Sequence, residues 1–168
     1  MNYFELFEIP VALHVDLAQL KQQFYLLSRK YHPDFYTREN DAAQADSLEM
    51  ASQVNKAYKV FQNQQATIQY VLQQKELLEE EEKYQLPADF LMEMLELNEQ
   101  LAEAKMDNDR KSIDEVTKKI AATEAAIFAP VKTIVEGYKD GHTTNEDLLK
   151  VKGYYFKKKY LERILAAM

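Results

Sequence analysis

Cysteine and tryptophan are absent from this 168-residue chain, and glycine and proline are rare, with 3 and 4 residues. Without cysteine there are no disulfides and no thiolate metal ligands, so packing alone must stabilise the fold. With so few glycine and proline residues, the tight turns that join β-strands would be hard to form. The 46% of residues that are hydrophobic are enough to form a packed core. The composition therefore predicts an all-α protein.

Charge and hydrophobic runs exclude further classes of function. The net charge is -7 and no basic block is present, which argues against a nucleic acid partner. No apolar run reaches the length of a membrane-spanning helix and no signal peptide is visible, so we expect a cytoplasmic protein with no membrane partner. His14, His32 and His142 are too scattered for a metal site, and we expect neither metal nor cofactor.

The first long helix is predicted to begin after Asp16, a good N-cap, and to end near Tyr31. Pro33 causes the end, because its ring disfavours the α conformation at His32 and it has no backbone N–H. Helical spacing predicts a buried stripe of Leu20, Phe24, Leu27 and Tyr31. A second face carries polar and basic side chains: Lys21, Tyr25, Ser28 and Arg29.

The tripeptide His32-Pro33-Asp34 follows this basic helix, and a later helix contains Val54-Asn55-Lys56-Ala57-Tyr58. Polar residues from Phe35 to Asp46 predict a loop and a frayed helix start between them. This helix–loop–helix near the N-terminus resembles a J-domain. The resemblance implies docking to a DnaK/HscA-type chaperone and stimulation of its ATPase, through Lys21, Tyr25, Arg29, Lys30, His32, Pro33 and Asp34.

We predict two domains: a J-domain at 1–75, a linker or helix end at 76–86, and a helical bundle at 87–168. The acidic run Glu79–Glu82, typical of a solvated segment, marks the boundary. Three helices follow, with Pro130 expected to kink the second. Because short loops join them, they should form an antiparallel three-helix bundle.

The first helix of that bundle carries more apolar residues than one buried face needs. Its predicted core stripe is Phe90, Met94, Leu97, Leu101 and Ala104. Away from this stripe lie three apolar and three acidic residues: Leu91, Met92, Leu95, Glu96, Glu99 and Glu103. Either another helix covers them, or they form a patch for a basic, hydrophobic partner.

The segment Phe90-Leu91-Met92-Glu93-Met94-Leu95-Glu96-Leu97 resembles the start of the C-terminal domain of the HscB family, the J-domain co-chaperones of iron–sulfur cluster assembly. The likeness covers nearly the whole chain. It implies binding of an IscU-type scaffold protein through Leu91, Met92, Leu95, Glu96, Glu99 and Glu103. An aromatic residue of the last helix completes this site in the family. Phe156 is the best match for it, and Tyr155 is the alternative.

Two other functions are open to the sequence. His32 and Asp34 could act as an acid–base pair, but no nucleophile or oxyanion donor accompanies them, so we expect no enzyme. The C-terminal helices could instead form a general client-binding or dimerising tail. Binding of folded scaffold in a defined stoichiometry, rather than of denatured polypeptide, discriminates these two functions.

Overall fold

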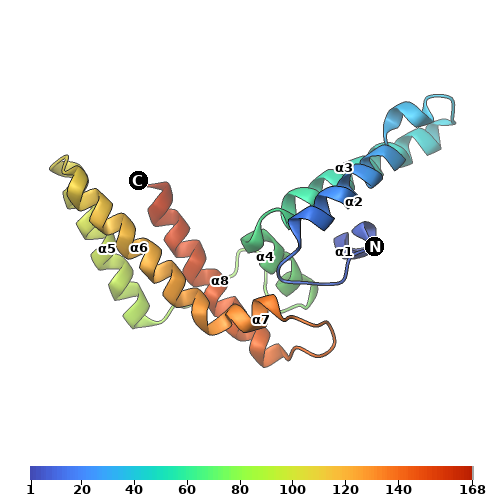
Figure 1. The fold of residues 1–168 in the computed structure, drawn as a ribbon. Helices are drawn as coiled ribbons and strands as arrows, with labels where there is room; N and C mark the ends of the chain where they lie inside the picture. The colour runs from blue at the N-terminus through green and yellow to red at the C-terminus, as the bar shows by residue number, and fades with distance from the viewer. Residues whose placement is uncertain (168) are drawn as a thin grey trace. The chain divides into compact units, whose positions relative to one another are not determined.

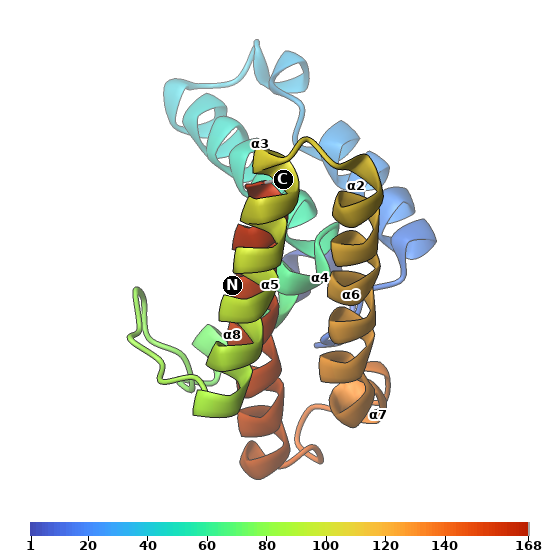
Figure 2. The same ribbon diagram turned by 90° about the vertical axis from the view of Figure 1, so that its left-hand side faces the viewer.

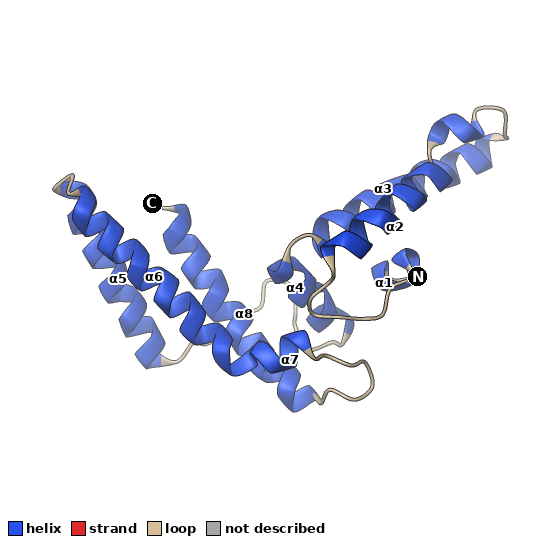
Figure 3. Ribbon diagram, in the orientation of Figure 1, coloured by secondary structure: helices blue, strands red, loops and turns tan. Residues whose placement is uncertain are grey.

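The computed structural model describes residues 1–167 and divides them into two compact units. The first unit is Met1–Lys75 with Tyr138–Thr143, and the second is Glu76–Gly137 with the chain from Thr144. Within the described residues every regular element is a helix (Figure 3). The all-α prediction is therefore confirmed, while the domain boundaries that the sequence suggested stay a prediction.

The first unit is built around a long helical hairpin (Figure 1). Its elements are α1 (Tyr3–Phe7), α2 (Leu17–Lys30), a 3-10 turn (Pro33–Tyr36), α3 (Asp41–Phe61) and α4 (Gln64–Gln74). The Asp16 carboxylate caps α2 by accepting the amides of Ala18 and Gln19 at 2.8 and 3.2 Å. The helix ends at Lys30, as Pro33 predicts.

Aromatic packing around Phe61 fixes the base of this hairpin. The rings of Phe4 and Phe7 lie 4.7 and 5.6 Å from the Phe61 ring. Tyr3 stacks on Tyr70 at 4.6 Å, and its backbone N–H donates to the Tyr70 hydroxyl at 2.9 Å. α1 and α4 are thereby held at one end of the hairpin, and the α2–α3 turn lies at its other end (Figure 1).

The stretch from Phe35 to Asp46, predicted to contain a loop and the start of the next helix, contains both, although the helix begins early in it. Pro33–Tyr36 form a 3-10 turn, and α3 already begins at Asp41. The Asn40 side chain starts α3 by accepting the Ala43 amide at 2.8 Å. Exposed positions of a capped helix can be polar throughout, so the polar composition of this stretch did not show how early the helix begins.

Three long helices form the second unit: α5 (Ala88–Met106), α6 (Arg110–Phe128) and α8 (Asn145–Ala166). They pack side by side with α6 antiparallel to the other two (Figure 2). The predicted core stripe of α5 is buried. It packs against apolar side chains of α6 and α8: Val116, Ile120, Leu161 and Ile164. The three-helix bundle is confirmed.

Pro130 interrupts the second bundle helix more strongly than the predicted kink. α6 ends at Phe128, a 3-10 turn spans Ala129–Val131, and a separate short helix, α7, follows at Lys132–Glu136. The proline lacks a backbone donor and its ring clashes with the preceding turn, which explains the break. Pro130 and Val131, at this break, line a cleft of the second unit.

The 76–86 segment is not the wholly solvated linker that its acidic run suggested. Glu82 forms an ion pair with Lys152 of α8 at 2.7 Å, and their side chains are only 17% and 14% exposed. Tyr84 stacks on Phe156 of α8 with ring centroids 4.5 Å apart and planes 1° from parallel. These contacts attach the segment to α8.

Residues 138–143 lie with the first unit, a feature the sequence did not indicate. Lys75 at the end of α4 contacts the Asp140 carboxylate at 2.5 Å, and the Tyr138 hydroxyl donates to the same oxygen at 2.8 Å. The Lys75 ammonium holds the pKa of Asp140 below its usual range. The short loop before α8 therefore belongs energetically to the first unit.

Candidate functional site

The His32-Pro33-Asp34 tripeptide forms a compact, exposed turn. His32 caps the 3-10 helix, because its Nδ1 accepts the Asp34 amide at 3.2 Å. The Tyr36 hydroxyl donates to the Lys30 carbonyl at 3.0 Å and fixes the turn to the end of α2. The side chains of His32 and Asp34 are 54% and 84% exposed. Local bonds thus hold the turn while its polar side chains remain accessible to a partner.

A cleft of about 370 Å³ lies beside this turn, between the end of α2 and the middle of α3. Its lining residues are Ser28, His32, Pro33, Ala51 and Asn55. Asn55 belongs to the predicted helix segment that carries the J-domain resemblance. The hairpin therefore brings the two parts of that resemblance to one concave surface.

The predicted basic face of α2 is exposed. The Tyr25 ring is 58% exposed, and the Lys21 ammonium lies 5.9 Å from its centroid. Within residues 1–167, no carboxylate forms an ion pair with Lys21, Arg29 or Lys30. Their charges are available to an acidic partner.

Phe35 is the residue at this turn that the sequence reasoning did not select. Its side chain is 67% exposed and its ring meets the His32 ring edge-on at 6.3 Å. An aromatic residue directly after His-Pro-Asp, in a stretch without helical periodicity, was the available signal. Its exposure adds an apolar surface to an otherwise polar turn.

The three off-stripe residues of α5 are exposed: Leu91 by 38%, Met92 by 66% and Leu95 by 58%. Glu96, Glu99 and Glu103 are exposed beside them. Among the described residues no other helix buries this set, so the interpretation in which a helix covers it is wrong. We call these six residues the acidic apolar patch.

The two candidate aromatic residues of α8 differ in accessibility. Tyr155 is 5% exposed, and burial raises the pKa of its phenol. Phe156 is partly buried and its ring is covered on one face by Tyr84. Phe156 is the more accessible of the two. The structure places it against the 76–86 segment.

Residues 1–167 contain no group of three or more His, Cys, Asp or Glu side chains placed to hold a metal ion. None of their helices is both long and apolar enough to cross a membrane.

An exposed His-Pro-Asp turn on a helical hairpin, followed by a separate antiparallel helical unit, defines a J-domain protein with a C-terminal helical domain. Residues 86–168 match the family model described as the HSCB C-terminal oligomerisation domain. The chain is also similar to solved structures. It superposes on human co-chaperone protein HscB with a TM-score of 0.82 and 25% identity, over 99% of this chain and 80% of that one.

Further relatives agree with this match. Co-chaperone protein HscB homologues of Colwellia psychrerythraea and Vibrio vulnificus are 33% and 35% identical over 111 and 114 residues, which is 65% and 67% of this chain. These alignments cover 63% and 66% of the two relatives, less than two thirds of their length. Chaperone HscB from Vibrio cholerae shares the fold, with a TM-score of 0.83 at 23% identity over 99% of this chain and 95% of that one. The chain belongs to the HscB family.

Proposed function

We propose that this protein is a cytoplasmic co-chaperone that stimulates the ATPase of a DnaK/HscA-type chaperone and delivers an IscU-type iron–sulfur scaffold protein to it. One observation carries the proposal: two exposed surfaces of different chemistry lie on two separate units. The first is the His-Pro-Asp turn with the basic face of α2. The second is the acidic apolar patch on α5. Two such surfaces suit a protein that binds two partners.

Contact with the chaperone is assigned to seven residues: Lys21, Tyr25, Arg29, Lys30, His32, Pro33 and Asp34. Unpaired cations on α2 would attract an acidic surface and orient it before close contact. The turn at the end of the same helix then presents His32 and Asp34, whose side chains are exposed. Their role is contact with the chaperone, since no nucleophile accompanies them and the relatives are named co-chaperones.

Contact with the scaffold is assigned to the acidic apolar patch and Phe156. Burying a large apolar side chain contributes roughly 1.5–3 kcal/mol. Leu91, Met92 and Leu95 gain only part of that within the unit, because they are 38%, 66% and 58% exposed. A basic and hydrophobic partner would bury them, while Glu96, Glu99 and Glu103 surround the contact with complementary charge.

A dimerising tail is the second candidate, and the description of the matched family model as an oligomerisation domain favours it. The same apolar side chains could bury one another across a two-fold interface. A general client-binding tail would use them for unfolded segments. Dimerisation, general client binding and scaffold binding each predict a different result for the alanine variant of the patch.

The test replaces Leu91, Met92 and Leu95 together by alanine. We expect the variant to keep the parent's melting temperature and its direct stimulation of the chaperone ATPase. It should lose scaffold binding, measured by calorimetry, and the additional stimulation that scaffold and co-chaperone give together. Exposed positions tolerate such changes, whereas removing core side chains would cost several kcal/mol.

A matched control replaces three exposed apolar residues outside the patch: Met106, Leu149 and Leu165, which are 87%, 49% and 38% exposed. This control should bind scaffold like the parent. Unfolding of the patch variant, or unchanged scaffold affinity, would contradict the assignment. Concentration-dependent sedimentation that only the patch variant loses would favour dimerisation. Loss of binding to denatured polypeptide, without effect on folded scaffold, would favour general client binding.

A further inference from the structure

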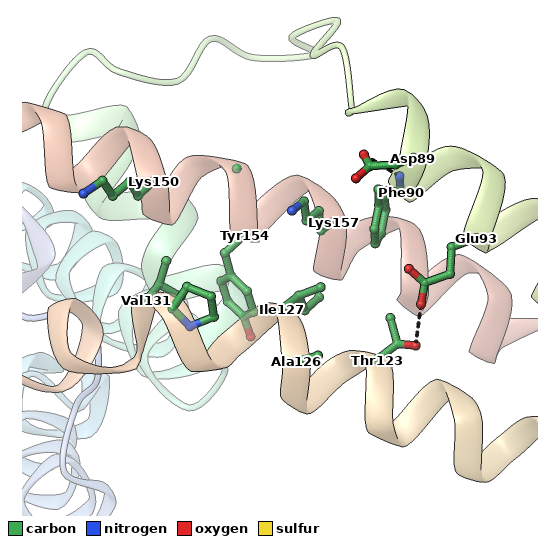
Figure 4. Close-up of a pocket in the computed structure, with 12 residues that line it drawn as sticks. Asp89, Phe90, Glu93, Thr123, Ala126, Ile127, Val131, Lys150, Tyr154 and Lys157 are labelled. Atoms are coloured by element: carbon green, nitrogen blue, oxygen red, sulfur yellow. Dashed lines mark hydrogen bonds between the residues drawn. The ribbon is translucent and has the colours of Figure 1, made fainter.

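A second cleft lies within the C-terminal unit, where α5 begins and α6 ends against α8 (Figure 4). Its volume is about 380 Å³. Phe90, Ile127, Val131 and Tyr154 supply its apolar walls, and small residues, among them Ala126, leave the space open. None of the residues assigned above to chaperone or scaffold lines it.

Four charged residues line this cleft, and three of them have partners. Asp89 accepts the Phe90 amide at 2.9 Å, and Glu93 accepts the Thr123 hydroxyl at 3.2 Å (Figure 4). Lys150, at the other end, lies 3.7 Å from Asp147. The two donors are an amide and a hydroxyl of the same unit, so each carboxylate accepts a hydrogen bond and keeps its negative charge.

Lys157 is different, because no carboxylate of the described residues pairs with it. Its ammonium lies 5.5 Å from the centroid of the Phe90 ring. A cation over an aromatic face is stabilised only modestly when it is solvent-accessible. The missing interaction in the cleft is therefore one with an anion, placed beside an aromatic wall.

Tyr154 supplies a polar group to the cleft in addition to the lysines. It extends from α8 between Val131 and Ile127 (Figure 4) and is only 6% exposed. Its ring lines the cleft, and none of the described residues has a fully buried side-chain nitrogen or oxygen without a hydrogen-bond partner, so a Tyr154 hydroxyl without a partner is open to the cleft. Burial raises the pKa of this phenol, which keeps it a proton donor at neutral pH. It can donate to a carbonyl or carboxylate oxygen in the cleft.

The spacing of the lysines suggests the shape of the occupant. Lys150 and Lys157 are seven residues apart on α8, a rise of about 10 Å along the helix. An extended chain covers the same distance in about three residues. We propose that this cleft binds an extended segment of a partner protein in which a large apolar side chain is flanked by Asp or Glu. The apolar side chain would lie against Phe90 and Tyr154, with a carboxylate at Lys157.

The experiment uses the full chain and two synthetic peptides. The acidic probe is acetyl-Glu-Glu-Phe-Leu-Glu-Glu-amide, and the matched neutral peptide carries Gln at each Glu position. Amide shifts in ¹H–¹⁵N spectra should be perturbed at Gly153, Tyr154 and Lys157. At low salt the acidic peptide should bind about tenfold more tightly than the neutral one, an advantage that added salt removes.

Three variants localise the interaction. Lys157→Gln should weaken the acidic peptide at least about fivefold and bring it close to the neutral one. Tyr154→Phe removes only the hydroxyl, and should weaken both peptides about twofold to tenfold. Lys159→Gln is the control, since this exposed lysine of the same helix does not line the cleft. Its affinity should equal that of the parent.

Four results would overturn the proposal. Equal binding of the two peptides would remove the role of charge. An equal loss in Lys157→Gln and Lys159→Gln would show that the attraction is not local. Shifts centred on the acidic apolar patch would assign the peptide to another surface. N-acetylphenylalanine binding as tightly as the peptide, with the same shifts, would identify a small carboxylate as the occupant.

Discussion

His32 combines two properties that a substitution can separate. Its Nδ1 caps a four-residue turn, while its ring is open to a partner. In His32→Gln we expect a melting temperature within about 2 °C of the parent, because surface substitutions rarely change stability by more than about 0.5 kcal/mol. Stimulation of the chaperone ATPase should be abolished. Circular dichroism and a single-turnover ATPase assay measure the two effects.

His14 is a matched control, since it is also exposed but lies before α2, outside the turn. His14→Gln should retain full stimulation. If His32→Gln instead melts many degrees lower than the parent, the histidine is structural, and the contact role assigned to the turn is wrong.

Features of single residues were predictable where they depend on residues nearby in the sequence, and not where they depend on the fold. The Asp16 cap was predictable, because a cap and the amides it accepts lie within three residues. Helical periodicity placed Leu91, Met92 and Leu95 off the core stripe, and only the structure showed that no other helix of the described residues covers them. The unpaired state of Lys157 was not predictable, because it depends on which side chains the fold places around it.

Among the elements, the 76–86 segment makes a prediction about pH. The Lys152 ammonium hydrogen-bonds Glu82 and lowers the pKa of its carboxyl. A carboxyl whose pKa is lowered by folding stabilises the fold above its unfolded-state pKa, and this contribution is lost as the pH falls through the folded-state pKa. A charge-assisted hydrogen bond this well shielded contributes about 1 kcal/mol.

Glu82→Gln should therefore lower the melting temperature at pH 7 by about 4–8 °C, as expected for a small domain. The difference from the parent should shrink as the pH is lowered below about 4.3, where carboxyls of the unfolded chain take up protons. Thermal melts between pH 3 and 7 test this. Glu80→Gln, in the exposed part of the same run, should follow the parent throughout. A difference that is constant with pH would indicate a packing effect instead.

Helices and breaks that are encoded by nearby residues were predicted from the sequence, whereas contacts between distant segments were not. Periodic apolar residues located the long helices, and Pro130 located the break after α6. The exact start of α3 at Asp41 was not predicted, because an exposed helix and a loop share a composition. The contacts of Glu82 and Tyr84 with α8 join residues about seventy positions apart, and no local pattern encodes such pairs. The cleft beside Tyr154 escaped prediction for the same reason.

At the scale of the whole molecule, net charge and local charge have opposite signs. The chain carries a net charge of -7, yet α2 presents Lys21, Arg29 and Lys30 without paired carboxylates in the described residues. Composition alone would predict repulsion from an acidic chaperone surface. The Debye length falls from about 30 Å at 0.01 M salt to about 8 Å at 0.15 M, so distant charges are screened before those in contact.

We expect affinity for the chaperone to fall as salt rises, because the three α2 cations lie nearest the acidic surface and salt also weakens their attraction to it. Replacing Lys21, Arg29 and Lys30 by Gln should weaken binding and flatten its salt dependence. The control replaces three exposed lysines of the second unit, Lys111, Lys118 and Lys132, and so removes the same number of positive charges. It should keep the parent's salt dependence, measured by calorimetry or surface plasmon resonance between about 0.02 and 0.3 M salt. Should both variants lose the salt dependence equally, net charge governs the encounter and the basic face of α2 has no specific role in it.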